Sequence, residues 1–230
     1  MNAALLYTLT GDPDSETLDS RLGEGFPAID AEGTQYLDGQ TLYHGTAATR
    51  IDEEKSVPVP GNKEILTEMD TVTRRVQTDF YLNLTDGWLG IDSSDGEFLV
   101  DYLLSTHGVL AEPLECNVQA WSEKLEQRDD AGVWGLSYSQ SIEDGHDSDR
   151  AGAQYHEDAA VHRLPPEGLS AVGFYYNWDG QPIRGMLAKS GYAAVYRDWT
   201  PERFAKWLDA EVLEYCAYEV DEQTTLGGDD

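Results

Sequence analysis

The feature that most constrains the fold is a succession of predicted strands, a turn and a helix that occurs twice along the chain. In each case, segments rich in β-branched and aromatic residues are joined by an Asp-Gly turn and followed by a capped amphipathic helix. The first unit covers residues 71–107 and the second covers residues 169–217. The sequence therefore predicts an α+β protein of mainly antiparallel sheet, with amphipathic helices packed on one face.

Both helices are predicted from end signals and apolar spacing. The first is expected near residues 95–107, because residues 94–97 have the Ser-x-x-Glu spacing of a capping box and Gly108 stands where a left-handed terminator belongs. The second is expected near residues 201–217, because Thr200 provides a capping hydroxyl directly before a proline. Each helix has one apolar stripe, which it should bury against the sheet.

Strands are predicted wherever apolar or β-branched residues form a short run that turn residues end. These segments are residues 3–10, 41–51, 71–84, 88–92, 132–141, 169–178, 183–188 and 192–197. Residues 56–61 contain two prolines and are expected to form an extended connector. A short helix carrying Trp121 and Leu125 and an exposed acidic loop at residues 142–153 complete the expected elements.

The length favours one domain. A chain of 230 residues can bury a sizeable core without added cross-links. We expect residues 1–220 to form a single compact α+β unit, with a sub-boundary near residues 56–64 or 142–153. The acidic residues 221–230 are expected to be a disordered tail.

The net charge is the strongest global signal in the sequence. Acidic residues outnumber basic residues by 44 to 15, which gives a formal net charge of −29 at pH 7. Such charge repels itself in a compact state, and concentrated salt screens the repulsion. Because acids recur in nearly every expected loop, the composition is typical of proteins of halophilic archaea. The alternative explanation of the charge is a nucleic-acid mimic or a binder of basic partners. Such a protein would concentrate its acidic residues on one face.

The same charge disfavours nucleic acid as a partner, because phosphate contacts depend on Lys and Arg. The only adjacent basic pair, Arg74-Arg75, is expected to pair with nearby acids. The two cysteines, Cys116 and Cys216, show no metal or redox spacing and are expected to be free buried thiols. No apolar run is long enough to span a membrane, and the first residues read as a strand, so we expect a cytoplasmic protein without membrane contact.

The segment Leu42-Tyr-His-Gly-Thr46 resembles the strand of ADP-ribosyltransferases that binds a nicotinamide dinucleotide. The resemblance implies that His44 and Thr46 help to hold the dinucleotide. It covers five residues, and the tyrosine-bearing strand and the acid that complete the site in that family have no match here. The alternative is a plain strand in which Leu42 packs, His44 faces solvent or makes a hydrogen bond, and Gly45 forms a bulge or turn.

A second candidate site combines histidines with carboxylates. His146, His156 and His162 lie close together in the sequence, and Asp149 lies among them. Imidazole and carboxylate ligands together suit zinc, manganese or iron. The spacing matches no established metal motif, so the alternative is a solvated acidic loop, and no cofactor is predicted.

The aromatic run Phe174-Tyr-Tyr-Asn-Trp178 is the third candidate. On a strand, alternation places Phe174, Tyr176 and Trp178 on one face and Tyr175 and Asn177 on the other. One face is expected to pack against helices. Tyr175, Tyr176 and Trp178 are the candidates for a surface that binds a protein partner, because Tyr and Trp are enriched at interfaces.

Catalytic signatures are missing from the sequence: it contains no nucleophile elbow, P-loop or Ser-x-x-Lys arrangement. The sequence therefore favours a non-catalytic binding, regulatory or assembly protein of a halophilic archaeon, of the kind that mobile elements or accessory gene sets carry. Its partner is expected to be another protein or a second copy. The alternatives are a metal-dependent enzyme using His146, His156 and His162, and an ADP-ribosyltransferase-like enzyme using His44.

Overall fold

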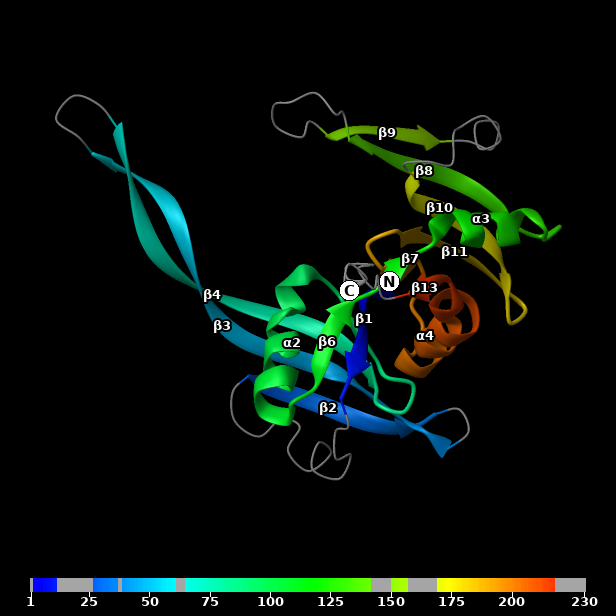
Figure 1. Cartoon of the computed structure of the whole chain (residues 1–230), viewed down its shortest axis with the longest axis horizontal. Coiled ribbons are helices and arrows are strands. Elements are labelled where there is room, and N and C mark those ends of the chain that lie inside the picture. The colour runs from blue at the N-terminus through cyan, green and yellow to red at the C-terminus, as the bar shows by residue number, and fades with distance from the viewer. Residues whose placement is uncertain are drawn as a thin grey trace, which may run out of the picture.

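Figure 1 shows the fold of the chain, a computed structural model that describes residues 2–11, 27–36, 39–60, 65–141, 150–156 and 169–217. The strands are β1 Asn2–Thr10, β2 Ala28–Gln35, β3 Thr41–Pro60, β4 Ile65–Asn83, β5 Trp88–Ile91, β6 Leu110–Pro113, β7 Glu115–Cys116, β8 Gly132–Ser141, β9 Arg150–His156, β10 Leu169–Trp178, β11 Gln181–Ala188, β12 Tyr192–Val195 and β13 Cys216–Ala217. The helices are α2 Phe98–Tyr102, α3 Val118–Glu126 and α4 Pro201–Trp207.

One antiparallel sheet contains most of these strands. Its order is β2-β3-β4-β5-β1-β12-β11-β10-β8-β9, and β6 pairs with β1 beside this path. The strands β7 and β13 form a separate short pair. The prediction of mainly antiparallel sheet is therefore confirmed, and each of the predicted strands is present.

Both predicted long helices are present as composite helical segments. Turns at Ser94–Gly96 and Leu103–His107 flank α2, and Gly108 ends it with a φ of 67°, as predicted. The capping box does not form, because the Ser94–Gly96 turn replaces the cap and the Glu97 N–H donates to the Ser94 carbonyl. The helical segment that starts with α4 continues to Tyr215, and Thr200 caps it by accepting from the Arg203 N–H.

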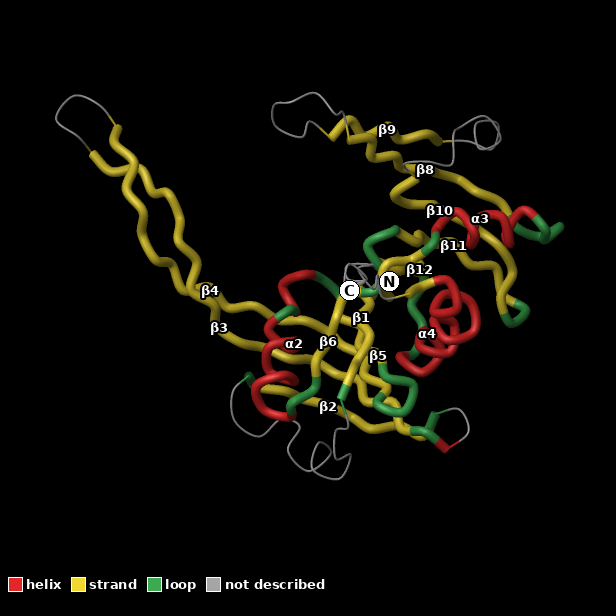
Figure 2. Tube along the Cα trace, in the orientation of Figure 1, coloured by secondary structure: helices red, strands yellow, loops and turns green. Residues whose placement is uncertain are grey.

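Helices cover both faces of the central strands (Figure 2). Successive residues of β1 point to opposite faces. Leu6 lies in the apolar core that contains Phe204 of α4, whereas Tyr7 lies in the core that contains Leu99 of α2. The structure thus differs from the predicted single covered face. The reason is that β1, β4 and β5 carry apolar residues at consecutive positions, so both of their faces must be buried.

The hairpin of β3 and β4 extends beyond the rest of the sheet. The two strands pair without interruption from Leu42↔Asn83 to Pro60↔Ile65. The neighbouring strand β2 covers β3 only as far as Ala48. Past that point the hairpin projects from the body as a twisted two-stranded ribbon (Figure 1), and we call residues 49–60 and 65–76 the arm. The expected connector at residues 56–61 is thus strand through Pro60.

Five strands were not predicted: β2, β6, β7, β9 and β13. Residues 150–153, expected in a loop, belong to β9 and pair with β8. The segments 142–149 and 221–230, predicted to be a loop and a tail, lie outside the described residues. Within the described part of the chain, no helix combines the length and the apolar character that crossing a membrane requires.

The prediction of free thiols is wrong, because Cys116 and Cys216 form a disulfide. The two cysteines lie directly opposite each other where β7 pairs with β13. They are 100 residues apart in the sequence, so spacing alone gave no sign of their proximity. The bond ties the start of α3 to the end of the last helical segment.

Candidate functional site

The aromatic strand β10 is mostly part of the core. Phe174 and Tyr176 are 0% and 2% exposed, so Tyr176 is not available to a partner, in contrast to its prediction as a surface residue. Tyr175 points the other way and is 41% exposed. Trp178 is half-buried, with its ring centroid 5.2 Å from that of Trp199. The predicted alternation is confirmed, with the apolar face packed against helices.

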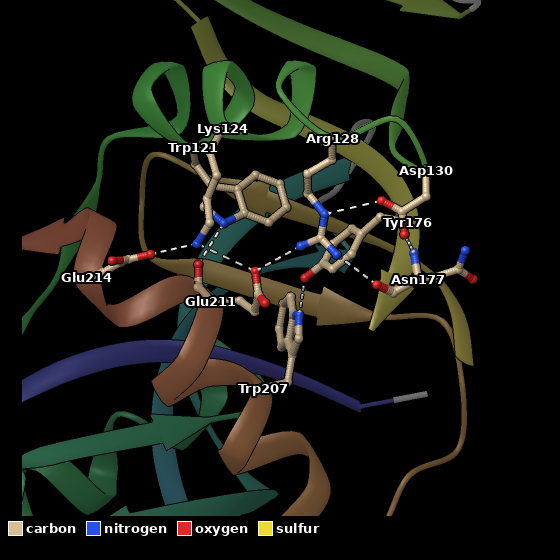
Figure 3. A network of polar contacts seen from close by, with 9 residues as sticks. All are labelled: Trp121, Lys124, Arg128, Asp130, Tyr176, Asn177, Trp207, Glu211 and Glu214. Atoms are coloured by element: carbon tan, nitrogen blue, oxygen red, sulfur yellow. Dashed lines mark hydrogen bonds and ion pairs between the residues drawn. The ribbon is translucent and has the colours of Figure 1, made fainter. Parts of the chain in front are cut away.

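Polar groups join this aromatic face to α3 and to the helical segment that starts with α4 (Figure 3). The Trp207 indole N–H donates to the Tyr176 hydroxyl at 2.6 Å, and the Trp121 N–H donates to the Glu211 carbonyl at 2.7 Å. The Arg128 guanidinium lies over the Tyr176 ring, 4.4 Å from its centroid. Burial raises the pKa of Tyr176, so its hydroxyl stays protonated and keeps its place in the network.

Charged side chains complete the same network. Both Lys124 Nζ and Arg128 Nη1 lie 3.5 Å from Glu211 Oε2, and Lys124 Nζ lies 2.6 Å from Glu214. Burial lowers the pKa of Lys124, but the bond to Glu214 and the charge of Glu211 outweigh it, so the pKa lies above its ordinary value. Each charge here has a partner within the described residues, so these ion pairs join α3 to the helical segment that follows α4.

The His-Gly-Thr segment lies inside β3. His44 Nε2 is 3.6 Å from a carboxylate oxygen of Glu202 at the start of α4, and the Thr46 hydroxyl donates to Asp79 at 2.8 Å. A Cβ on Gly45 would lie 2.0 Å from the carbonyl oxygen of Asp30 on β2. Gly45 therefore permits a close approach of strands in continuous register and not the expected bulge or turn.

The predicted metal ligands are not brought together in the described part of the chain. His146, Asp149 and His162 lie outside the described residues, and His156 is the last residue of β9, opposite Gly135. Among the residues that are described, no group of three or more His, Cys, Asp or Glu side chains is placed to hold a metal ion. The metal site stays a prediction.

The base of the arm carries an arrangement that the sequence did not predict. Arg50 of β3 and Arg75 of β4 are direct cross-strand neighbours, so their side chains leave the same face of the ribbon. Both are exposed, and within the described residues neither guanidinium has a hydrogen bond or an ion pair. Like charges directly opposite each other are unfavourable in a sheet. The two side chains border an open hollow of about 450 Å³.

On the opposite face of the arm, Arg74 and Lys55 are paired with acids. Arg74 donates to Glu53 at 2.8 Å and binds Asp95, before α2, through both terminal nitrogens at 2.8 and 2.9 Å. Lys55 Nζ lies 2.9 Å from Glu53 as well. The hydrogen bond from Lys55 and the charge of Arg74 lower the pKa of Glu53. Of the adjacent pair Arg74-Arg75, only Arg74 therefore meets acids, because alternation sends Arg75 to the other face.

A separate polar group lies where the helical segment after α4 approaches the start of β5. Burial raises the pKa of Asp209, and the charge of Asp86 raises it further, while donation from Tyr36 and the nearby Trp88 N–H lower it. The Tyr36 hydroxyl donates to Asp209. The net result is a carboxyl whose pKa in the folded protein lies above its ordinary value.

This raised pKa predicts a pH dependence of stability. The folded state keeps the Asp209 proton to higher pH than the unfolded state, so the free energy of unfolding should fall as pH rises from about 4 through the folded pKa. Asp209→Asn should remove this contribution. We expect the unfolding free energy of the variant, relative to wild type, to rise between pH 4 and pH 7 in denaturant titrations. Asp101→Asn, an exposed control in α2, should show no such trend, and equal trends in both would contradict the assignment.

Comparison with known proteins gives no information about the function of this chain. No protein-family model matches the chain, and the search of curated proteins gave no match. The candidate site therefore rests on the chain's own geometry: Arg50 and Arg75 at the base of the arm have no ion pair in the part of the chain that the structure describes. The sequence signal that could have found them is the pair of patterns Thr-Arg-Ile and Arg-Arg-Val on two adjacent strands, once their register is known.

Proposed function

We propose that this chain is a non-catalytic assembly protein whose copies associate through the arm. The observation that carries the proposal is the cross-strand pair of Arg50 and Arg75, exposed and unpaired within the described residues. Two adjacent guanidinium groups repel each other, so a carboxylate placed between them relieves the repulsion and accepts charge-assisted hydrogen bonds. Two guanidinium groups without acidic partners among the described residues are unusual in so acidic a chain, and this supports a role for them in binding another molecule.

A second copy of the chain is the partner that the charge pattern favours. Its 44 acidic residues against 15 basic ones offer carboxylates over much of its surface. Guanidinium groups match carboxylates in bidentate geometry, which gives orientation as well as affinity. The arm also has the reach for this contact, because twelve residues of strand span about 40 Å.

The edges of the arm disfavour simple strand-to-strand pairing. Pro58 removes a backbone donor from the edge of β3, and the exposed Glu54 and Lys55 place charges beside it. We therefore infer that copies associate through a face of the arm and not through its edges. Met69, 65% exposed, falls by alternation on the same face as Arg50 and Arg75, because it lies an even number of residues from Arg75.

We also propose that the protein works in the concentrated salt of a halophilic cytoplasm. The net charge of −29 supports this, since copies that repel at low salt can approach when the Debye length falls to about 3 Å near 1 M salt. Contacts between guanidinium and carboxylate groups act at shorter range than this. Association should therefore strengthen from about 0.1 M to about 1 M salt.

The double substitution Arg50→Ser and Arg75→Ser tests the proposal. We expect it to weaken self-association at least tenfold, because charge-assisted hydrogen bonds contribute about 1.5–3 kcal/mol each. The stability of the monomer should change by less than about 0.5 kcal/mol, since the removed guanidinium groups make no hydrogen bond or ion pair within the described residues. Light scattering across a concentration series in molar salt measures the first quantity, and denaturant unfolding the second.

The matched control is Arg184→Ser with Arg197→Ser. It makes the same change in net charge, but Arg184 stacks on Trp134 and Arg197 donates to the Pro182 carbonyl on the body. The control should associate as the wild type does. Equal loss of association in both variants would mean that net charge alone governs it, and no loss in either would remove the arm from the interface.

A further inference from the structure

The face of the arm that carries Arg50 and Arg75 also carries acidic side chains farther from the body. Asp52 and Glu54 leave this face, because each lies an even number of residues from Arg50 on the same strand. Both are exposed, and Glu54 has no hydrogen bond or ion pair among the described residues. One face of the arm thus bears cations at its base and carboxylates about 7–13 Å farther out.

This order of charges is complementary to its own reverse. If two arms lie face to face and antiparallel, with a two-fold axis at Asp52, then Glu54 of each copy lies opposite Arg50 of the other. Arg75 is the cross-strand neighbour of Arg50, so its guanidinium can reach the same carboxylate. If the arms were parallel, the four guanidinium groups of the two copies would meet and repel one another.

The exposed methionine of the arm fits the same arrangement. Met69 is 65% exposed and pairs in register with Ser56, four residues beyond Asp52 along β3. The two-fold axis therefore places Met69 opposite the cross-strand pair of Ala48 and Gln77 in the other copy, four residues before Asp52. Ala48 and Gln77 line the open hollow of about 450 Å³ at the base of the arm. This hollow can receive a flexible, unbranched apolar side chain.

We propose that this face of the arm is a self-complementary dimer interface, in which two arms pack antiparallel about a two-fold axis at Asp52. The inference rests on the proposed association through the arm and names the acceptor of its arginines. Glu54 of each copy accepts hydrogen bonds from Arg50 and Arg75 of the other, and Met69 of each enters the hollow of the other. Every contact occurs twice, as an interface on a two-fold axis requires.

The axis also brings the two Asp52 carboxylates together, which opposes association. Each of them accepts from the Thr73 hydroxyl of its own arm at 2.6 Å. Because concentrated salt screens like charges, their repulsion makes the dimer depend on salt. Asp52→Asn should therefore strengthen dimerisation about threefold in about 0.1 M salt. Asp70→Asn, which removes the same charge from the other face of the arm, should have a smaller effect, and equal effects would contradict the axis.

Two charge-reversed variants test the acceptor. Glu54→Arg sets cations against Arg50 and Arg75 in both halves of the dimer, and the double variant Arg50→Glu with Arg75→Glu sets acids against Glu54. In about 1 M salt, each variant alone is expected to dimerise more weakly than the wild type by about tenfold or more. A one-to-one mixture restores opposite charges at both contacts. Sedimentation velocity of the mixture should therefore show a dimer of nearly wild-type affinity.

Met69→Ser tests the apolar contact separately. It should weaken dimerisation about tenfold, because the methionine loses its burial against the other copy. Val72→Ser is the matched control, since Val72 is 37% exposed and leaves the other face of the arm. Circular dichroism of each variant verifies that the monomer is folded. Equal dimerisation by the two variants would contradict the placement of Met69 in the hollow.

The outcomes separate this inference from the proposed function. If Arg50→Glu with Arg75→Glu prevents association but Glu54→Arg associates as the wild type does, the arginines bind another acid. That result overturns the antiparallel dimer and keeps the arm as the interface. A mixture that fails to dimerise, when each variant alone is impaired, overturns the antiparallel dimer as well. If neither variant alone affects association, the inference and the proposed function are both wrong.

Discussion

Replacing Trp207 with alanine is expected to lower the free energy of unfolding by about 3–5 kcal/mol. Trp207 is completely buried, its ring stacks on Phe174 and Phe204 with centroids 5.9 and 5.7 Å away, and its N–H donates to Tyr176. The substitution removes the contact of Trp207 with Phe174 of β10 and leaves the Tyr176 hydroxyl without its donor. Denaturant unfolding followed by circular dichroism measures the loss.

Smaller changes separate the packing of Trp207 from its hydrogen bond. Trp207→Phe keeps an aromatic ring but removes the N–H, and Tyr176→Phe removes the acceptor. Each is expected to cost about 1–3 kcal/mol, because each leaves one buried polar group unsatisfied or a small void. The double variant should cost less than the sum of the two. Additive costs would show that the two side chains do not act as a pair.

Loss of the Cys116–Cys216 disulfide is expected to lower the free energy of unfolding by about 2–4 kcal/mol. The bond closes a loop of 100 residues and thus restricts the unfolded chain strongly. It also holds β7 against β13, where the Asn117 N–H donates to the Tyr215 carbonyl at 2.7 Å and Asn117 caps α3. Cys116→Ala with Cys216→Ala, or reduction of the wild type, should both show this loss.

The control for the disulfide is the effect of reductant on the double alanine variant. Its denaturation midpoint should not respond to reductant, whereas that of the wild type should fall towards it. If the wild type keeps its midpoint after complete reduction, verified by thiol titration, the bond does not contribute as expected.

Local sequence patterns were sufficient to predict the elements whose formation depends on residues close together in the sequence. The strands β4 and β5 follow from apolar runs around Thr85-Asp-Gly87, and the start of α4 follows from Thr200 and its proline. These features depend on backbone preferences and on hydrogen bonds between near neighbours. The choice of which face each helix covers is not local, and this part of the prediction differs from the structure.

Elements that depend on pairing with distant segments were not predicted, because such pairing leaves no local sequence pattern. The strand β2 has few β-branched residues and is defined by pairing with β3 over Ala28↔Ala48 to Gln35↔Thr41. The prolines of the arm indicated a connector, yet a two-stranded ribbon has a free edge along each strand, where a missing N–H costs little. Cys116 and Cys216 likewise meet only through the folding of the intervening chain.

The candidate site at the arm depends on register, which the sequence does not show. Arg74-Arg75 is visible as a basic pair, but its two members leave opposite faces of β4. Arg74 meets Glu53 and Asp95, and Arg75 meets Arg50 across the ribbon. The register thus places Arg74 on the same face as Glu53, and Arg75 opposite Arg50 on the other face.

The central claim is that copies of the chain associate through the arm. Its most direct test is sedimentation velocity of the wild type and of a variant in which Asn-Gly replaces residues 50–75, joining the register partners Thr49 and Val76. In about 1 M salt, where the Debye length is about 3 Å, the wild type should sediment as an oligomer and the variant as a folded monomer. An oligomer of the same number of copies in both, or a monomeric wild type, would contradict the account.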